Sequence, residues 1–152
     1  MQVRPGPGPT ARGAVALALI VAVLSVTLTA CTNRSLTGQT WLLAATTISS
    51  PTFSGIVPPE WMTKYTIEFA EDGTWTGKAD CNDVSGTYTT SGNDGIAIVR
   101  GSSTLAVCPE GSFADLYLDG LASAETYRVS AEQLVLGLGG DDTFSFASQP
   151  EE

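Results

Sequence analysis

Apolar and polar residues alternate in the middle of the chain, where residues 65–69 read YTIEF. A period of two is typical of a β-strand that buries one face. Residues 71–73 (EDG) form a tight-turn sequence, and residues 74–79 return with the apolar Trp75. The pattern therefore predicts an antiparallel hairpin.

Similar short segments, rich in β-branched and aromatic residues, lie on both sides of this hairpin. They cover residues 36–48, 84–89, 96–100, 125–129, 133–136 and 143–146. Residues 49–59 hold three Pro and one Gly, so we expect a long loop there. Phe53 and Ile56 are expected to pack beneath that loop, with a binding role as the alternative.

A helical period occurs once. Phe113, Leu116, Tyr117 and Leu121 fall on one stripe of a helix. Ser112, with Asp115 three residues later, fits the acidic form of a capping box at its start. The chain is therefore predicted to be mainly β, with one helix.

The N-terminal segment has the pattern of a secretory signal. Arg4 and Arg12 precede residues 14–28, which are almost purely apolar. A bilayer-spanning helix needs about 20 residues, so this run is short for a permanent span, although an uncleaved anchor is the alternative. The run ends in Leu28-Thr29-Ala30-Cys31, which resembles the lipobox of bacterial lipoproteins.

The lipobox resemblance implies that the Cys31 thiol carries a diacylglyceryl group and begins the mature chain. A lipid with two acyl chains would hold the protein stably on a membrane, outside the cytoplasm. The expected organisation is a signal peptide (1–30), a lipidated tether (31–35), one folded domain (36–148) and a disordered tail (149–152). We expect the membrane to be a partner through this anchor, and the domain to be a monomer.

Processing at Cys31 would make the chain more acidic. The full sequence has a net charge of −9, with seven basic and sixteen acidic residues. Removal of Arg4 and Arg12 leaves five basic residues and a net charge of −11. A surface of this sign repels nucleic acid, so no nucleic-acid partner is expected.

Two cysteines remain when Cys31 carries lipid. Cys81 and Cys108 would then lie in an oxidising compartment, where disulfides persist, and we expect them to be bonded to each other. Two independent buried thiols are the alternative. The chain has neither His nor a CxxC motif, so a metal site at this pair is not expected.

The sequence contains no convincing catalytic set. The absence of His removes the common Ser–His and Cys–His arrangements. Lys64 and Lys78 are expected to face solvent. Residues 80–86 lack the spacing of a calcium loop, and Asp141-Asp142 is expected to form a solvated turn. We therefore expect no enzyme activity, no cofactor and no metal.

The three tryptophans have different expected roles. Trp41 and Trp75 lie in predicted strands and are expected in the core. Trp61, which follows Pro58-Pro59-Glu60, is a candidate for an exposed contact residue.

From residue 41 to residue 146 the chain resembles the META domain, a module of heat-shock-associated envelope lipoproteins. The matching segments are Thr40-Trp41-Leu42-Leu43, residues 67–73, Asp80-Cys81-Asn82, Gly86-Thr87-Tyr88, residues 104–109, Tyr127-Arg128-Val129 and Leu134-Val135-Leu136. The departure is Asp80, where the family prefers Gly. Because Gly often serves a special backbone angle, the turn before Cys81 is in question.

The resemblance implies a compact antiparallel sheet that curls towards a barrel, with one helix and no established catalytic residues. It also implies a link to envelope stress tolerance. The first hypothesis is a non-enzymatic, lipid-anchored envelope protein that supports envelope integrity through contacts with a partner protein. The alternative is a small-ligand-binding or enzyme-inhibiting β-barrel lipoprotein.

Overall fold

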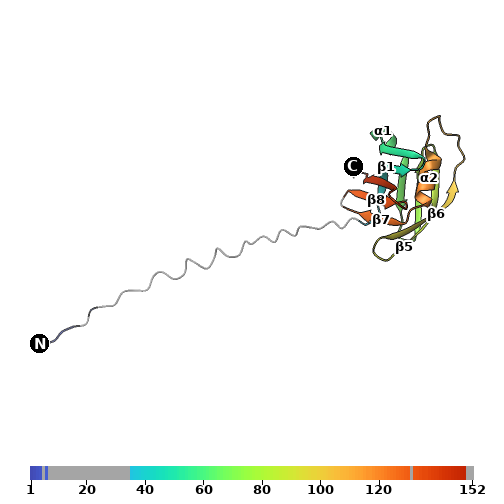
Figure 1. Ribbon diagram of the computed structural model, residues 1–152. Helices are drawn as coiled ribbons and strands as arrows, with labels where there is room; N and C mark the ends of the chain where they lie inside the picture. Colours follow the sequence, from blue (N-terminus) through green and yellow to red (C-terminus); the bar gives the residue numbers. More distant parts are fainter. Residues whose placement is uncertain (5, 7–34, 131, 150–152) are drawn as a thin grey trace. The chain divides into compact units, whose positions relative to one another are not determined.

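A computed structural model describes residues 1–4, 6, 35–130 and 132–149 (Figure 1). The chain divides into two units, Met1–Cys31 and Thr32–Glu152. The apolar run and Cys31 lie outside the described residues, as do residues 150–152. No helix among the described residues is both long and apolar enough to cross a bilayer.

The described part of the second unit contains nine strands and two helices. In chain order they are β1 (Thr40–Ser49), β2 (Thr52–Ile56), α1 (Pro59–Met62), β3 (Tyr65–Phe69), β4 (Thr74–Ala79), β5 (Asn82–Ser91), β6 (Gly95–Ser103), α2 (Ala114–Ala122), β7 (Thr126–Val129), β8 (Gln133–Gly137) and β9 (Thr143–Ser148). The prediction of a mainly β domain is confirmed.

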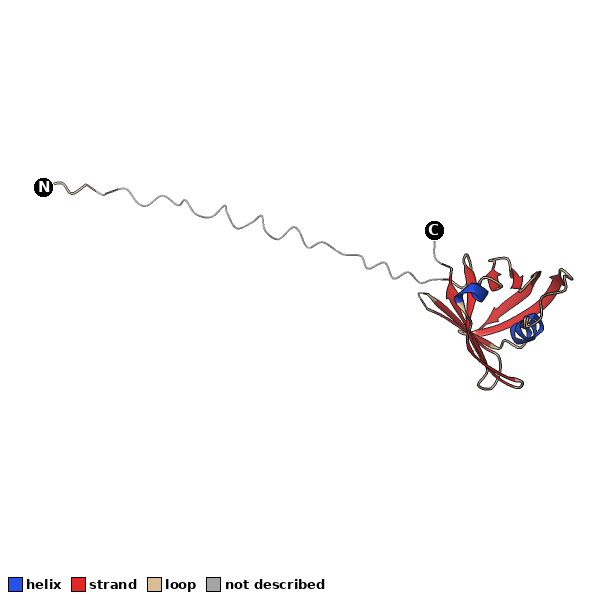
Figure 2. Cartoon of the chain, turned by 90° about the horizontal axis from the view of Figure 1, so that it is seen from above, coloured by secondary structure: helices blue, strands red, loops and turns tan. Residues whose placement is uncertain are grey.

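All strand pairs in the sheet are antiparallel, and the sheet closes on itself (Figure 2). Its order is β2-β1-β3-β4-β5-β6-β7-β8-β9, and β1 also pairs with β9. The narrowest junction joins β6 to β7, where the register contains one pair, Gly95 with Thr126. The predicted curled, barrel-like sheet is therefore present.

Strand β1 connects the barrel to an extension beyond it. Its first residues, Thr40–Leu42, pair with β3, and its later residues, Ala45–Ser49, pair with β2. On its other edge, β1 pairs with β9 and has an irregularity between Leu43 and Ala45. Strand β2 thus continues along β1 beyond the pairing with β3, at the edge of the sheet.

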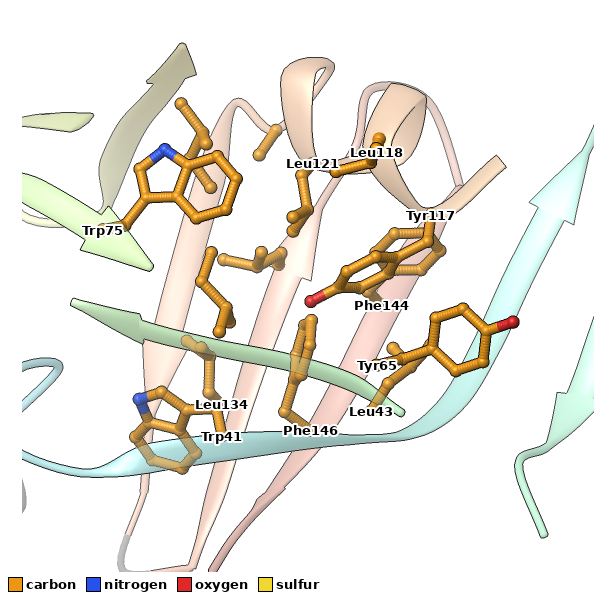
Figure 3. Packing of buried hydrophobic residues seen from close by; sticks show 14 of the residues in the cluster. Trp41, Leu43, Tyr65, Trp75, Tyr117, Leu118, Leu121, Leu134, Phe144 and Phe146 are labelled. Atoms are coloured by element: carbon orange, nitrogen blue, oxygen red, sulfur yellow. The ribbon is translucent and has the colours of Figure 1, made fainter. Parts of the chain in front are cut away.

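The core fills the barrel and includes the inner face of α2. Trp41 and Trp75 are at most 1% exposed, as expected for core residues. The indole Nε1 of Trp41 donates to the Leu36 carbonyl oxygen at 3.0 Å, which fixes the start of the domain to the core. Tyr117 of α2 lies against Phe144 of β9 (Figure 3), with the ring centroids 5.8 Å apart.

The expectation of a loop over residues 49–59 is wrong. Residues 52–56 form β2, and a second, four-residue helix α1 follows. The proline residues lie outside β2, where they remove no hydrogen bond from its pairing with β1. The expectation that Phe53 and Ile56 pack beneath a loop is also wrong, because these side chains are 37% and 87% exposed.

The start of α2 differs from the predicted capping box. The N-cap residue is Phe113, without a side-chain capping bond, and the Ser112 hydroxyl accepts instead from the Ala114 N–H at 3.3 Å. Leu116 is only partly buried, whereas Leu118 is buried. The inner stripe is therefore rotated slightly from the predicted one.

Candidate functional site

An apolar groove lies beside the edge strand β2 and has a volume of about 410 Å³. We call it the β2 groove. Its walls come from β1, β2, α1 and the segment before α2. The lining residues are Thr46, Phe53, Ser54, Gly55, Ile56, Val57, Pro58, Trp61, Gly111 and Phe113.

Phe113 is the central side chain of the groove. Its ring stacks on Tyr65, with the centroids 3.7 Å apart, and lies 5.2 Å from Phe53 and 6.2 Å from Trp61. Its backbone N–H also donates to the Tyr65 hydroxyl at 3.1 Å. Since Tyr65 is fully buried, this contact holds the groove to the core.

Helix α1 carries Trp61, a further aromatic residue of the groove. Pro59 occupies the first helical position, where its missing N–H costs nothing. The Lys64 ammonium lies 5.5 Å from the Trp61 ring centroid and 3.5 Å from an Asp80 carboxylate oxygen. Trp61 is 37% exposed, which agrees with its candidacy as a contact residue.

Asp141 and Asp142, which the sequence assigns to a solvated turn, lie in different environments. Asp141 is exposed, whereas an Asp142 carboxylate oxygen accepts from the Ser49 N–H at 3.0 Å and the Ser49 hydroxyl at 2.6 Å. Asp142 therefore fixes the end of β1, near the start of β2.

A second groove, of about 580 Å³, crosses the outer side of the sheet. Its lining is rich in hydroxyl groups and consists of Thr40, Thr66, Glu68, Thr76, Gly77, Lys78, Asp83, Val84, Ser85, Ser102, Ser103 and Thr104. Lys78 is half-exposed and pairs with Asp83 at 2.9 Å. The expectation that Lys64 and Lys78 reach solvent is met, and each cation is engaged with a carboxylate.

Cys81 and Cys108 form a disulfide, as expected, across a separation of 27 residues. Asn82 fixes the same segment, because its Oδ1 accepts from the Ala106 N–H at 2.8 Å and its Nδ2 donates to the Ala106 carbonyl oxygen at 3.1 Å. No group of three potential metal ligands occurs among residues 35–130 and 132–149.

The structure thus joins one predicted contact residue, Trp61, to residues that the sequence did not assign to a site. Phe113 and Gly111 belong to a segment more than 45 residues after Trp61 in the chain. The available signal was the pair of apolar residues, Phe53 and Ile56, in a Pro-flanked segment. The predicted lipid attachment residue, Cys31, lies outside the described residues.

A family model described as the META domain matches residues 34–151. No curated protein matches the chain. Among solved structures, a DUF4847 family protein from Bacteroides vulgatus is similar, with 17% identity and a TM-score of 0.56, over 77% of this chain and 96% of that one. A protein from Burkholderia xenovorans is 20% identical, with a TM-score of 0.58, over 76% and 85%. These two likenesses concern the fold.

Proposed function

The chain belongs to the META domain family, and we propose that it is a lipid-anchored, non-catalytic protein of the cell envelope that acts through contacts with other proteins. The observation that carries the proposal is the lipobox-like sequence Leu28–Cys31 at the end of an apolar run. The Cys81–Cys108 disulfide supports it, because such bonds persist mainly in oxidising compartments.

Within the folded domain, the β2 groove lies at the far end of β1 from Leu36. Leu36 is buried beside the start of that strand, whereas the groove lies along its other end. The exposed aromatic residues of the groove make it the surface that we assign to protein contact.

The non-catalytic part of the proposal is supported by the chemistry of the chain. It has no His, and Lys64 and Lys78 are each paired with a carboxylate. The aromatic groups of the β2 groove offer contact area rather than a nucleophile or a general base. This composition suits recognition of an apolar surface.

The anchor is tested by Cys31→Ala in cells, with Thr32→Ala as the matched control. We expect the Cys31 variant to lose acylation and to accumulate as the unprocessed precursor, whereas the Thr32 variant is processed normally. Mass spectrometry of the N-terminus and fractionation of the cells measure both properties. Normal processing of the Cys31 variant would contradict the proposed anchor.

A second candidate function is the binding of a small apolar molecule. The volume of the β2 groove, about 410 Å³, lies within the roughly 300–1,000 Å³ that is common for small-molecule sites. A thermal-shift screen with apolar compounds at micromolar concentration distinguishes this function from protein contact. A compound that raises the melting temperature of the protein but not that of a Trp61→Ala variant would favour it.

A further inference from the structure

Strand β2 is an open edge of the sheet. It pairs with β1 on one side, and no strand of the described residues pairs with its other side. Its five residues, Thr52–Ile56, are all exposed. An edge strand carries a row of free N–H and C=O groups, which can pair with another chain.

The register shows which backbone groups are available. The Val57 N–H donates to the Ala44 carbonyl oxygen at 2.8 Å. Gly55 and Phe53 precede Val57 at steps of two, so their backbone N–H and C=O groups face β1 in the same way. The intervening residues, Ser54 and Ile56, therefore direct their N–H and C=O groups away from β1. Outward N–H and C=O groups therefore occur at every second residue of β2, which is the spacing at which a sheet pairs with a further strand.

Strand β2 also lacks the usual protection of an edge. Its sequence, TFSGI, contains no charged residue and no Pro. Natural edge strands commonly carry Lys or Pro, which prevent pairing with other chains. An unprotected edge with an exposed Ile56 beside an aromatic groove is a combination that peptide-binding domains use, because the edge binds the backbone and the groove selects a side chain.

The charges around the β2 groove specify the partner further. Glu60 and Glu110 are exposed and adjoin the lining residues Trp61 and Gly111, and Asp142 lies near the start of β2. Lys64, two residues after the end of α1, is paired with Asp80. The rim is therefore acidic, and it favours a segment with Lys or Arg beside its apolar residue.

We propose that β2 binds an extended segment of a partner protein as an additional antiparallel or parallel strand. An apolar side chain of the segment enters the β2 groove between Phe53, Trp61 and Phe113, and basic residues beside it face the acidic rim. The inference deepens the protein-contact part of the proposed function and rests on it. A second copy of this chain fits less well, because both copies would bring an acidic rim to the same edge.

The probe for this site is a displayed library of random dodecapeptides, selected on the purified mature chain. We expect enrichment of peptides that carry an apolar residue flanked by Lys or Arg. An enriched peptide, made synthetically, is then methylated on alternate backbone nitrogens. Because pairing needs those donors, one methylation frame should weaken binding by about tenfold or more, while the other frame has little effect.

Two variants at one position provide the matched control on the protein side. Ile56→Pro removes the outward N–H together with the side chain, whereas Ile56→Ala removes the side chain alone. Ile56 is 87% exposed, so both variants should keep the fold, which thermal melting checks. We expect the Pro variant to bind about tenfold more weakly than the Ala variant.

The absence of any enriched peptide would overturn the inference, as would binding that neither backbone methylation nor Ile56→Pro affects. Selection of peptides without basic residues would overturn the assignment of a basic partner. Concentration-dependent dimers that Ile56→Pro abolishes would point to a second copy instead and would also overturn it. These measurements use purified protein, so their failure is distinct from a failure of the anchor, which the Cys31→Ala experiment reports.

Discussion

At the scale of single residues, Asp80 combines an unusual backbone with a structural contact. It is the only non-glycine residue with a positive φ, 57°, among the described residues. Its N–H donates to the Lys64 carbonyl oxygen at 2.7 Å, and its carboxylate, 8% exposed, faces the Lys64 ammonium. The turn before Cys81 thus has the left-handed conformation for which the family prefers Gly, and Asp is among the residues that tolerate it.

Two buried tyrosines give a matched prediction. The Tyr117 hydroxyl has no hydrogen-bond partner in the described part of the chain, whereas the Tyr65 hydroxyl accepts from the Phe113 N–H. Tyr117→Phe should therefore leave the free energy of unfolding unchanged or raise it by about 1 kcal/mol, and Tyr65→Phe should lower it by about 1 kcal/mol. Urea denaturation of the two variants measures the difference.

Tyr117 also predicts a pH dependence of the free energy of unfolding. Burial raises the pKa of Tyr117 well above its ordinary value. In the unfolded chain this group loses its proton near pH 10, whereas the folded chain keeps it, so the stability falls as the pH rises above about 10. Tyr117→Phe should reduce that loss. An equal fall in both proteins between neutral and alkaline pH would contradict the assignment.

At the scale of elements, short runs of β-branched and aromatic residues, several with an alternating apolar pattern, predicted most strands. The pattern YTIEF became β3, and residues 133–137 became β8, with Leu134 and Leu136 fully buried. Strand β2 could not be found in this way, because all of its residues are exposed and no alternation marks it. Only its pairing with β1, through the register, defines it as a strand.

The β2 groove could be predicted only in part. Trp61, which follows Pro58-Pro59-Glu60, is a contact candidate in the sequence, whereas a binding role for Phe53 is only the alternative to packing. Phe113 joins them through tertiary packing on Tyr65, a residue 48 positions earlier. A single sequence gives no such distances, so the aromatic wall was not predictable from local patterns.

Position 120 of helix α2 requires glycine because the helix packs closely on Phe144 there. A Cβ added to Gly120 would overlap the ring of Phe144. Gly120→Ala would gain up to about 1 kcal/mol in helix propensity, but crowding of this kind typically costs about 1–3 kcal/mol. We expect a net loss of stability, measured by the shift of the urea midpoint.

Asp119→Ala, at the neighbouring position, is the control for Gly120→Ala. Asp119 is exposed, and its ion pair with Arg100 joins two exposed side chains, so its loss should change the free energy of unfolding by less than about 1 kcal/mol. Equal or greater stability of Gly120→Ala would show that Phe144 moves aside without penalty.

At the scale of the molecule, the disulfide secures a long segment that lies outside the sheet. After β6 ends at Ser103, Leu105 and Val107 are almost fully exposed, and the chain then returns through Cys108 to α2. Elimination of Cys31 was enough to predict the pairing of Cys81 with Cys108. The structure was needed to show that the bonded segment continues at Gly111 into the wall of the β2 groove.

Loss of this bond should destabilise the whole domain. Removal of a native disulfide typically costs about 2–5 kcal/mol, because the unfolded chain regains the freedom of the closed loop. We expect reduction to lower the melting temperature by several degrees. A Cys81→Ser, Cys108→Ser double variant should melt near the reduced protein and should not respond to reductant, and an unchanged melting temperature after complete reduction would contradict the prediction.

The pairing of β1 with β9 also sets the order of events during synthesis. The ribosome makes β1 first among the strands, but its partner along residues 41–47 is made last. Until translation reaches residue 148, β1 lacks that neighbour and the barrel cannot close. Contacts between such distant parts of a chain form slowly. The barrel of a nascent chain therefore closes only after synthesis of β9, and shorter chains expose the edge of β1 that β9 covers.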